Sequence, residues 1–197
     1  MSGQTALSDC TVTLSYHKTA YDGKEKTPKI TVKNSNGIVS DDDYTVTYAD
    51  NVNAGNAKVI ITAKTGDVSI KGTVEKGFII AKAKQSVSAA STDEQIHVKA
   101  STEIQADGIG DISLETSTPD LVDIKETTVI GKKAGLALIK VTVSGDANHE
   151  EASTMVAVGV NENHVIEQMI ENQKTLENGD VEYDEVQRCT LCKEEIS

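Results

Sequence analysis

Two cysteines near the C-terminus have a spacing that suits metal binding. Cys189 and Cys192 are separated by two residues, and two thiolates on such a tight turn can provide half of a tetrahedral zinc site. His164 is the histidine nearest to them in the sequence and would be a third ligand. A closed structural site needs four ligands, so the fourth would come from Glu194 or from a second chain.

The same cysteine pair could instead serve a purpose that involves no metal. A C-x-x-C sequence can form a strained, reducible disulfide. It can also be a turn that survives from a degenerate repeat. We favour the disulfide or the turn over bound zinc, and we expect no other cofactor.

The remaining candidate residues do not form a catalytic pattern. Cys10 would need a base to act as a nucleophile, but His17 lies seven positions later, which places it on the opposite face of a strand. Cys10 is therefore expected to be a buried thiol. His97 and His149 are isolated in the sequence and are expected on the surface or in loops. The chain contains no G-x-S-x-G, phosphate-binding glycine loop or H-E-x-x-H motif, so we expect no catalytic residues and no enzyme activity.

The elements that carry these residues are expected to be strands. The chain has 20 Val, 17 Ile and 21 Thr but only 8 Leu, and β-branched residues suit half-buried sheet surfaces. Apolar and polar residues alternate in Thr11–Tyr16 and Lys140–Ser144, which is typical of strands with one buried face. One Phe, five Tyr and no Trp provide less aromatic surface than a sugar-binding cleft or a base-stacking platform usually needs.

The charge of the chain excludes several classes of partner. It has 19 Lys and Arg against 31 Asp and Glu, a net charge of −12, which disfavours nucleic acid and anionic membrane surfaces. No apolar run approaches the ~20 residues needed to cross a bilayer, so we expect no membrane insertion. The first residues, MSGQTALSD, lack the basic and apolar segments of a signal peptide. The chain is therefore expected to be either an internal fragment or a protein that is not exported by that route.

Two similar segments indicate a duplicated domain. Ala54–Ala57 and Ala134–Ala137 both have the sequence A-G-x-A, and each leads into an apolar run that ends in a Gly-Asp pair. Gly55 and Gly135 are 80 positions apart, which suits one small β-sandwich. We predict an all-β chain with two tandem antiparallel Ig-like sandwiches, at residues 1–84 and 85–160.

Residues 161–197 form an acidic tail of different character. Asn163 could cap the start of a helix and Gly179 its end, so we predict a helix over residues 164–177. Its apolar residues fall at helical spacing and could form a partner-binding face that attaches the chain to a larger assembly: Val165, Ile166, Met169, Ile170 and Leu176. The alternative is a solvated appendage of the second sandwich.

Residues 8–83 resemble a bacterial Ig-like module found in large surface proteins of Gram-positive gut and soil bacteria. The similarity lies in Tyr21-Asp22-Gly23-Lys24, Asp43–Tyr48 and Asn53–Ala57. The stretch that follows resembles an Ig-like module of the invasin/intimin-related type, through Ser113–Ile124 and Val129–Gly135.

The tail resembles a short Cys-containing repeat that often follows such modules. His164, Glu177-Asn178-Gly179 and the Cys189/Cys192 pair carry this similarity. In that repeat the intervening residues form small strands, which conflicts with the helix predicted from the apolar spacing.

The resemblance implies a non-enzymatic structural or adhesion module, a stalk or presenter in a bacterial cell-surface protein. It implies an extracellular location as part of a larger exported protein, and a partner that is a protein or a surface glycan. The alternative is a phage virion decoration or attachment protein built from Ig-like domains, in which the tail docks on the virion.

Overall fold

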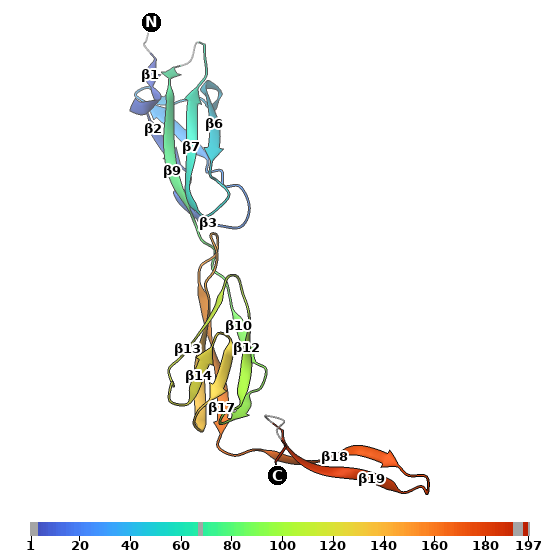
Figure 1. Ribbon diagram of the computed structural model, residues 1–197. Coiled ribbons are helices and arrows are strands. Elements are labelled where there is room, and N and C mark those ends of the chain that lie inside the picture. The colour runs from blue at the N-terminus through green and yellow to red at the C-terminus, as the bar shows by residue number, and fades with distance from the viewer. Residues whose placement is uncertain (1–3, 67–68, 191–194, 197) are drawn as a thin grey trace. The chain divides into compact units, whose positions relative to one another are not determined.

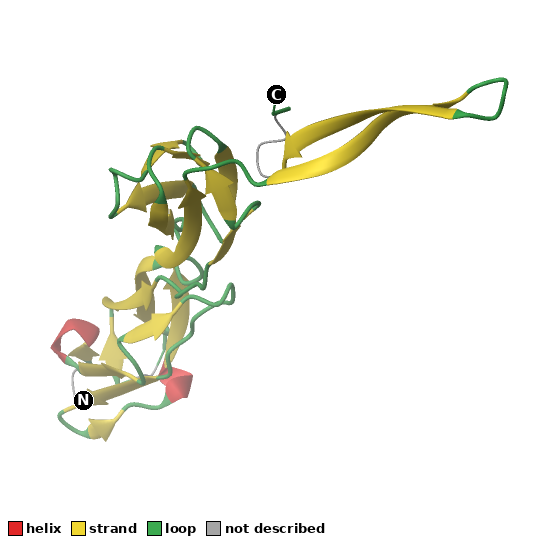
Figure 2. Ribbon diagram, turned by 90° about the horizontal axis from the view of Figure 1, so that it is seen from below, coloured by secondary structure: helices red, strands yellow, loops and turns green. Residues whose placement is uncertain are grey.

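The computed structural model describes residues 4–66, 69–190 and 195–196, and its regular structure is nearly all β-strand. Figure 2 shows strands throughout, with short helical turns in red. Within the described residues these 3₁₀ turns are the only helical elements, η1 (Leu7–Asp9) and η2 (Asp41–Asp43). The predicted all-β fold is confirmed at this level. The described part of the chain includes no helix with the length and apolarity that crossing a membrane requires.

The chain forms two compact units. The first comprises Met1–Lys84 and Asp146–Glu150, and the second comprises Gln85–Gly145 and Glu151–Ser197. Each unit has its own cluster of buried apolar residues.

The first unit has a three-stranded sheet in the order β2-β4-β5, a four-stranded sheet in the order β3-β9-β7-β6 and a short parallel pair, β1 with β8. The strands, most of them labelled in Figure 1, are β1 (Thr5–Ala6), β2 (Thr11–Leu14), β3 (Lys18–Ala20), β4 (Ile30–Asn34), β5 (Gly37–Ile38), β6 (Tyr44–Ala49), β7 (Gly55–Ala63), β8 (Ile70–Lys71) and β9 (Thr73–Ala81).

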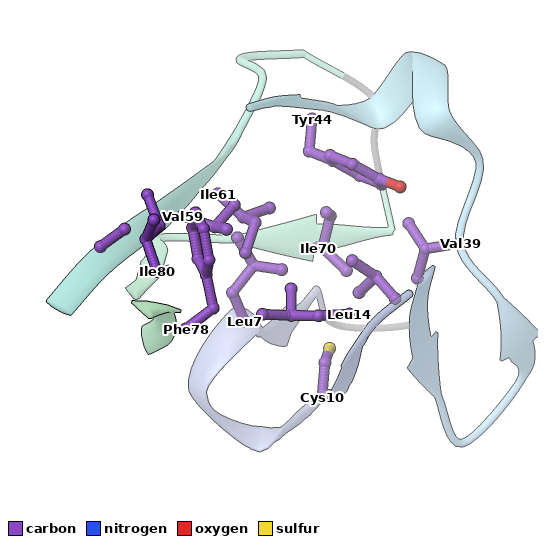
Figure 3. Packing of buried hydrophobic residues seen from close by; sticks show 12 residues of the cluster. Leu7, Cys10, Leu14, Val39, Tyr44, Val59, Ile61, Ile70, Phe78 and Ile80 are labelled. Atoms are coloured by element: carbon purple, nitrogen blue, oxygen red, sulfur yellow. The ribbon is translucent and has the colours of Figure 1, made fainter. Parts of the chain in front are cut away.

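The core of the first unit is aliphatic because the inward positions of its strands carry Val, Ile and Leu. Leu14 and Val32 come from one sheet and Val59 and Ile80 from the other, and all four are at most 4% exposed. Figure 3 shows Leu7, Leu14, Ile70 and other members of this cluster pointing toward one another. Burying each such side chain contributes about 1.5–3 kcal/mol, so this packing holds the two sheets together.

The second unit has two four-stranded sheets, in the orders β10-β12-β15-β14 and β11-β17-β16-β13. Its strands are β10 (Ser88–Ser91), β11 (Gln95–His97), β12 (Ser101–Asp107), β13 (Ile112–Thr116), β14 (Val122–Lys125), β15 (Thr128–Gly131), β16 (Gly135–Val143) and β17 (Ala152–Asn161). Ile104 and Val129 from one sheet pack with Ile139 and Val158 from the other. This unit therefore also consists of two layers around one core.

The helix predicted over residues 164–177 is wrong. This segment contributes β18 (Ile166–Thr175), which pairs antiparallel with β19 (Val181–Cys189) to form the orange and red hairpin in Figure 1. Gly179 has a φ of 88° in the hairpin turn, so its left-handed conformation serves a strand reversal and not a helix end. Strands in this segment agree with the resemblance to a repeat of small strands.

The physical reason for this error lies in how the apolar residues are spaced. Val165 with Ile166 and Met169 with Ile170 are adjacent pairs four positions apart, and such pairs fit helical spacing as well as strand alternation. Cross-strand contacts with residues 181–189 decide between the two. Arg188 Nε donates to Glu171 Oε1 at 2.7 Å and Arg188 Nη2 donates to Glu171 Oε2 at 3.1 Å.

Candidate metal centre

Three side chains of the types that commonly ligate metals meet in the second unit. His97 ends β11, His164 lies between β17 and β18, and Cys189 ends β19. One ligand atom from each residue lies within 4.8 Å of the corresponding atoms of the other two. Imidazole nitrogen and thiolate sulfur are the ligands that zinc prefers in proteins.

The backbone around His97 is held by a network of hydrogen bonds. β11 runs parallel to β17, with His97 opposite Asn161, and Val98 N–H donates to Asn161 O at 2.9 Å. The next residues turn back, because Lys99 has a φ of 74° and Ala100 N–H donates to His97 O at 3.0 Å. The position of His97 is therefore determined by the sheet on one side and by a tight turn on the other.

Gly131 allows this turn to lie close to β15. Lys99 N–H donates to Gly131 O at 2.8 Å, and Gly131 N–H donates to Ala100 O at 2.9 Å. A Cβ atom at position 131 would lie 2.7 Å from His97 O, which is closer than real contacts allow. A glycine is needed here because of a close backbone approach.

The His97 ring is buried and oriented. The residue is 5% exposed, and its Nδ1 lies 2.6 Å from Val98 O. Because a carbonyl oxygen can only accept, Nδ1 carries the proton and donates. Nε2 is buried and has no hydrogen-bond partner within the described residues. The expectation that His97 lies on the surface or in a loop is therefore wrong.

The other two residues lie at the open end of the β18–β19 hairpin, where His164 precedes β18 and Cys189 ends β19. The rings of His97 and His164 have centroids 4.3 Å apart, and Cys189 is 0% exposed. Thr190 N–H donates to Val165 O at 2.8 Å, which closes the open end of the hairpin and brings Cys189 beside His164. This arrangement joins two of the three metal ligands predicted from the sequence.

The third predicted ligand, Cys192, lies outside the described residues, as does Glu194. Sequence reasoning missed His97, because it lies far from the cysteines along the chain. The sequence contains one signal for it: His97 ends an alternating segment, Gln95–His97, just before a turn. That signal does not identify a ligand by itself.

The apolar residues predicted to bind a partner are accessible but do not form one stripe. Alternate residues of a strand point to opposite faces, so Ile166 and Ile170 share one face of β18 and Met169 lies on the other. Ile166, Met169 and Ile170 are 51%, 43% and 60% exposed. Val165 and Leu176 flank the strand and are also exposed. Partner binding by these residues stays a prediction.

Cys10 belongs to the core of the first unit and takes no part in the cluster. It is 9% exposed, and its Sγ donates to Ala6 O at 3.4 Å. Burial, with a smaller contribution from the charge of Asp9, raises the pKa of this thiol. A raised pKa keeps a thiol protonated and unreactive.

Comparisons with known proteins find only distant similarity. No family model matches the chain, and no curated protein matches it. Among solved structures, it is similar to the C-terminal 282-residue fragment of intimin in complex with the intimin-binding domain of the translocated intimin receptor, with 14% identity and a TM-score of 0.30 over 81% of this chain. It is also similar to domains 4–9 of the surface layer protein SbsC, with 12% identity and a TM-score of 0.28 over 96% of this chain. The chain spans 66% of the intimin fragment's length and 38% of the SbsC structure's length. At these TM-scores neither similarity assigns a function.

Proposed function

We propose that this chain is a non-enzymatic structural and adhesion module of a bacterial cell-surface protein. Residues 1–84 and 85–160 act as two Ig-like domains that resist force, and residues 161–197 form a tail that contacts a protein or glycan partner. Its place is extracellular, within a larger exported protein. The virion alternative stays a prediction, because a fold does not distinguish a bacterial surface from a phage surface.

One feature of the strand pairing supports this proposal. In each unit an early strand pairs in parallel with the last strand of the sandwich, β3 with β9 and β11 with β17. Backbone hydrogen bonds bracket both pairs. Ile79 N–H donates to His17 O at 2.9 Å in the first unit, and Gly159 N–H donates to Glu94 O at 2.9 Å in the second.

Parallel pairing changes how a sheet responds to force. When a chain is pulled from both ends, segments before the early strand peel away first, and the load then reaches the parallel pair. These two strands are pulled in opposite directions along their common axis, so their hydrogen bonds are loaded together. In an antiparallel hairpin the bonds open one after another from the end. Each bond contributes only about 0.5–1.5 kcal/mol, so simultaneous loading is what provides mechanical resistance.

Single-molecule force spectroscopy on the full chain tests this function. We expect two main unfolding events, each releasing on the order of 25–30 nm of chain, because each unit has roughly 80 residues that extend by about 3.3–3.6 Å apiece. A single event that releases both lengths at once would contradict two separate load-bearing units.

A matched pair of variants tests the parallel clamp. Ile79→Pro removes the N–H that donates to His17 O, whereas Ile79→Ala retains it. The Ile79 side chain is 47% exposed, so the alanine variant loses little packing. We expect the proline variant alone to lower the unfolding force of one event and to leave the other event unchanged. Equal forces in the two variants would show that β3 and β9 do not carry the load.

A further inference from the structure

We propose that His97, His164 and Cys189 bind one zinc ion, which ties β11 to the β18–β19 hairpin. The three ligand atoms already lie within 4.8 Å of one another. Zinc bonds of about 2.0–2.3 Å at tetrahedral angles place ligand atoms roughly 3.3–3.7 Å apart. The ligand atoms would therefore close in by at most about 1.1–1.5 Å around the ion, within the range of small rotamer changes.

The His97 ring has the arrangement of a metal ligand. Ligating histidines usually donate their other ring N–H to a carboxylate or a backbone carbonyl, which fixes the tautomer and orients the ring. Here Nδ1 donates to Val98 O at 2.6 Å, so the lone pair of the neutral ring lies on Nε2. That atom is buried without a partner among the described residues, and a buried polar atom in that state is costly. A zinc ion would satisfy it.

The ligand set selects the metal. Two imidazoles and a thiolate suit zinc and disfavour calcium and magnesium, which take oxygen ligands. Burial of His97 and Cys189 keeps water from most of the site, as in a structural centre. The site as proposed consists of His97, His164 and Cys189.

The β18–β19 hairpin has few buried side chains, so a metal centre would add to its stability. All residues of β18 and β19 are exposed except Glu171, Val186, Arg188 and Cys189. An isolated two-stranded hairpin is marginally stable in water, and this one contributes no residue to the core of the second unit. Because metal sites seldom exist in unfolded chains, the free energy of zinc binding would stabilise the folded hairpin. A disulfide within the C-x-x-C pair would not connect the hairpin to β11.

Zinc titration of the full chain tests this proposal. The protein is reduced, stripped of metal with a chelator and titrated with zinc, and bound metal is counted by elemental mass spectrometry. We expect one zinc per chain. Cobalt in place of zinc should give the visible spectrum of a tetrahedral site with a thiolate-to-metal charge-transfer band.

Variants show which residues bind the ion. His97→Gln, His164→Gln and Cys189→Ser should each weaken zinc binding at least tenfold, and His17→Gln, an exposed histidine of the first unit, should leave it unchanged. Amide exchange in β16 and β17 checks that each variant is folded. His164 is less buried than His97, so its variant keeps the test valid if His97→Gln misfolds. Amides of residues 166–189 should exchange at least tenfold more slowly with zinc than without it.

Three results would overturn the proposal. The first is a reduced, folded chain that binds no zinc. The second is zinc affinity that does not change in either folded histidine variant, which would mean that the ion sits elsewhere. The third is a chain, isolated without reductant, in which Cys189 resists alkylation in denaturant both with and without chelator, because a disulfide would then hold the thiol. Each of these leaves the force measurement on the first unit unaffected.

Discussion

The rings of His97 and His164 lie 4.3 Å apart between centroids, although β12 to β17 separate the two residues in the sequence. His97 reaches this position because β11 pairs with the last residues of β17, and His164 follows β17 directly. The parallel pairing proposed to resist force therefore also places the first histidine beside the second. A single register thus serves both the sheet and the candidate metal centre.

Gly131→Ala should destabilise the second unit and weaken zinc binding. The new Cβ would meet His97 O at 2.7 Å, so the turn at residues 97–100 would have to move, at a cost of about 1–3 kcal/mol. Gly77→Ala is a matched control, because the nearest atom to its Cβ would be 3.9 Å away. Chemical denaturation should show a change within about 0.5 kcal/mol for the control. If both variants changed the free energy of unfolding equally, the turn at residues 97–100 would be able to move away from the new Cβ without loss of stability.

The first unit should lose stability at high pH, because ionisation of Tyr44 removes a stabilising contribution of this residue. Its hydroxyl donates to the Asp41 carboxylate, and burial together with Asp41 raises the pKa of Tyr44 from 10.0 to about 12. Because the folded state holds the phenolic proton more tightly, this contribution is complete below pH 10 and is lost as the pH rises through about 12. The loss should be on the order of 2 kcal/mol.

The measurement is the denaturation midpoint of the first unit's transition, followed from pH 9 to pH 12 in wild type and in Tyr44→Phe. The phenylalanine variant lacks the titrating group, so its midpoint should fall less over this range. Parallel curves for the two proteins would show that Tyr44 does not titrate differently on unfolding.

The pairing of Glu171 with Arg188 should make the hairpin sensitive to acid. Hydrogen bonds from Arg188 lower the pKa of Glu171 below its ordinary value of 4.5. A lowered pKa in the folded state contributes stability above the ordinary pKa, and this contribution is lost as the pH falls through the folded value. Amide exchange of β18 and β19, corrected for its intrinsic pH dependence, should therefore accelerate below about pH 4.5.

Glu171→Gln separates this effect from general acid unfolding. The glutamine variant has no carboxylate to protonate at this position, so its hairpin should be less protected at neutral pH and should lose less protection on acidification. If the variant and the wild type lose protection in parallel, the ion pair does not hold the hairpin.

Removal of residues 164–197 should leave both cores intact. Neither buried cluster contains a residue from the hairpin, so the free energy of unfolding of each unit, measured without metal, should change by less than about 1 kcal/mol. Asn161 is retained in this truncation because its carbonyl accepts from Val98 N–H. A large loss of stability in the second unit would show that the hairpin is part of its core.

Local patterns in the sequence were sufficient to predict strands in the two units, where burial alternates along each strand. Gly55 and Gly135, the glycines of the two A-G-x-A segments, each begin a nine-residue strand, β7 and β16, that pairs with the last strand of its sandwich. Alternation identifies such strands because every second side chain must be buried. Whether the two segments descend from a duplication stays a prediction.

Local patterns gave the wrong secondary structure, a helix, for residues 164–177 of the tail, where few side chains are buried. Most residues of β18 and β19 are exposed, so no buried face constrained the spacing, and adjacent apolar pairs fitted a helix as well as a strand. The partner strand, β19, made the difference through contacts such as that between Arg188 and Glu171. These contacts depend on the reversal at Gly179, which a helical interpretation uses as an end.

The sequence by itself determined the all-β character of the chain and the two cysteines and one histidine that suit a metal, because these depend on residue type and short-range spacing. Only the tertiary structure brought His97 to His164 and Cys189, buried the ring and left Nε2 without a hydrogen-bond partner among the described residues. The reason is that strand pairing joins residues without regard to their distance along the chain. The spacing of residues within one segment does not show which distant strand will lie next to a histidine.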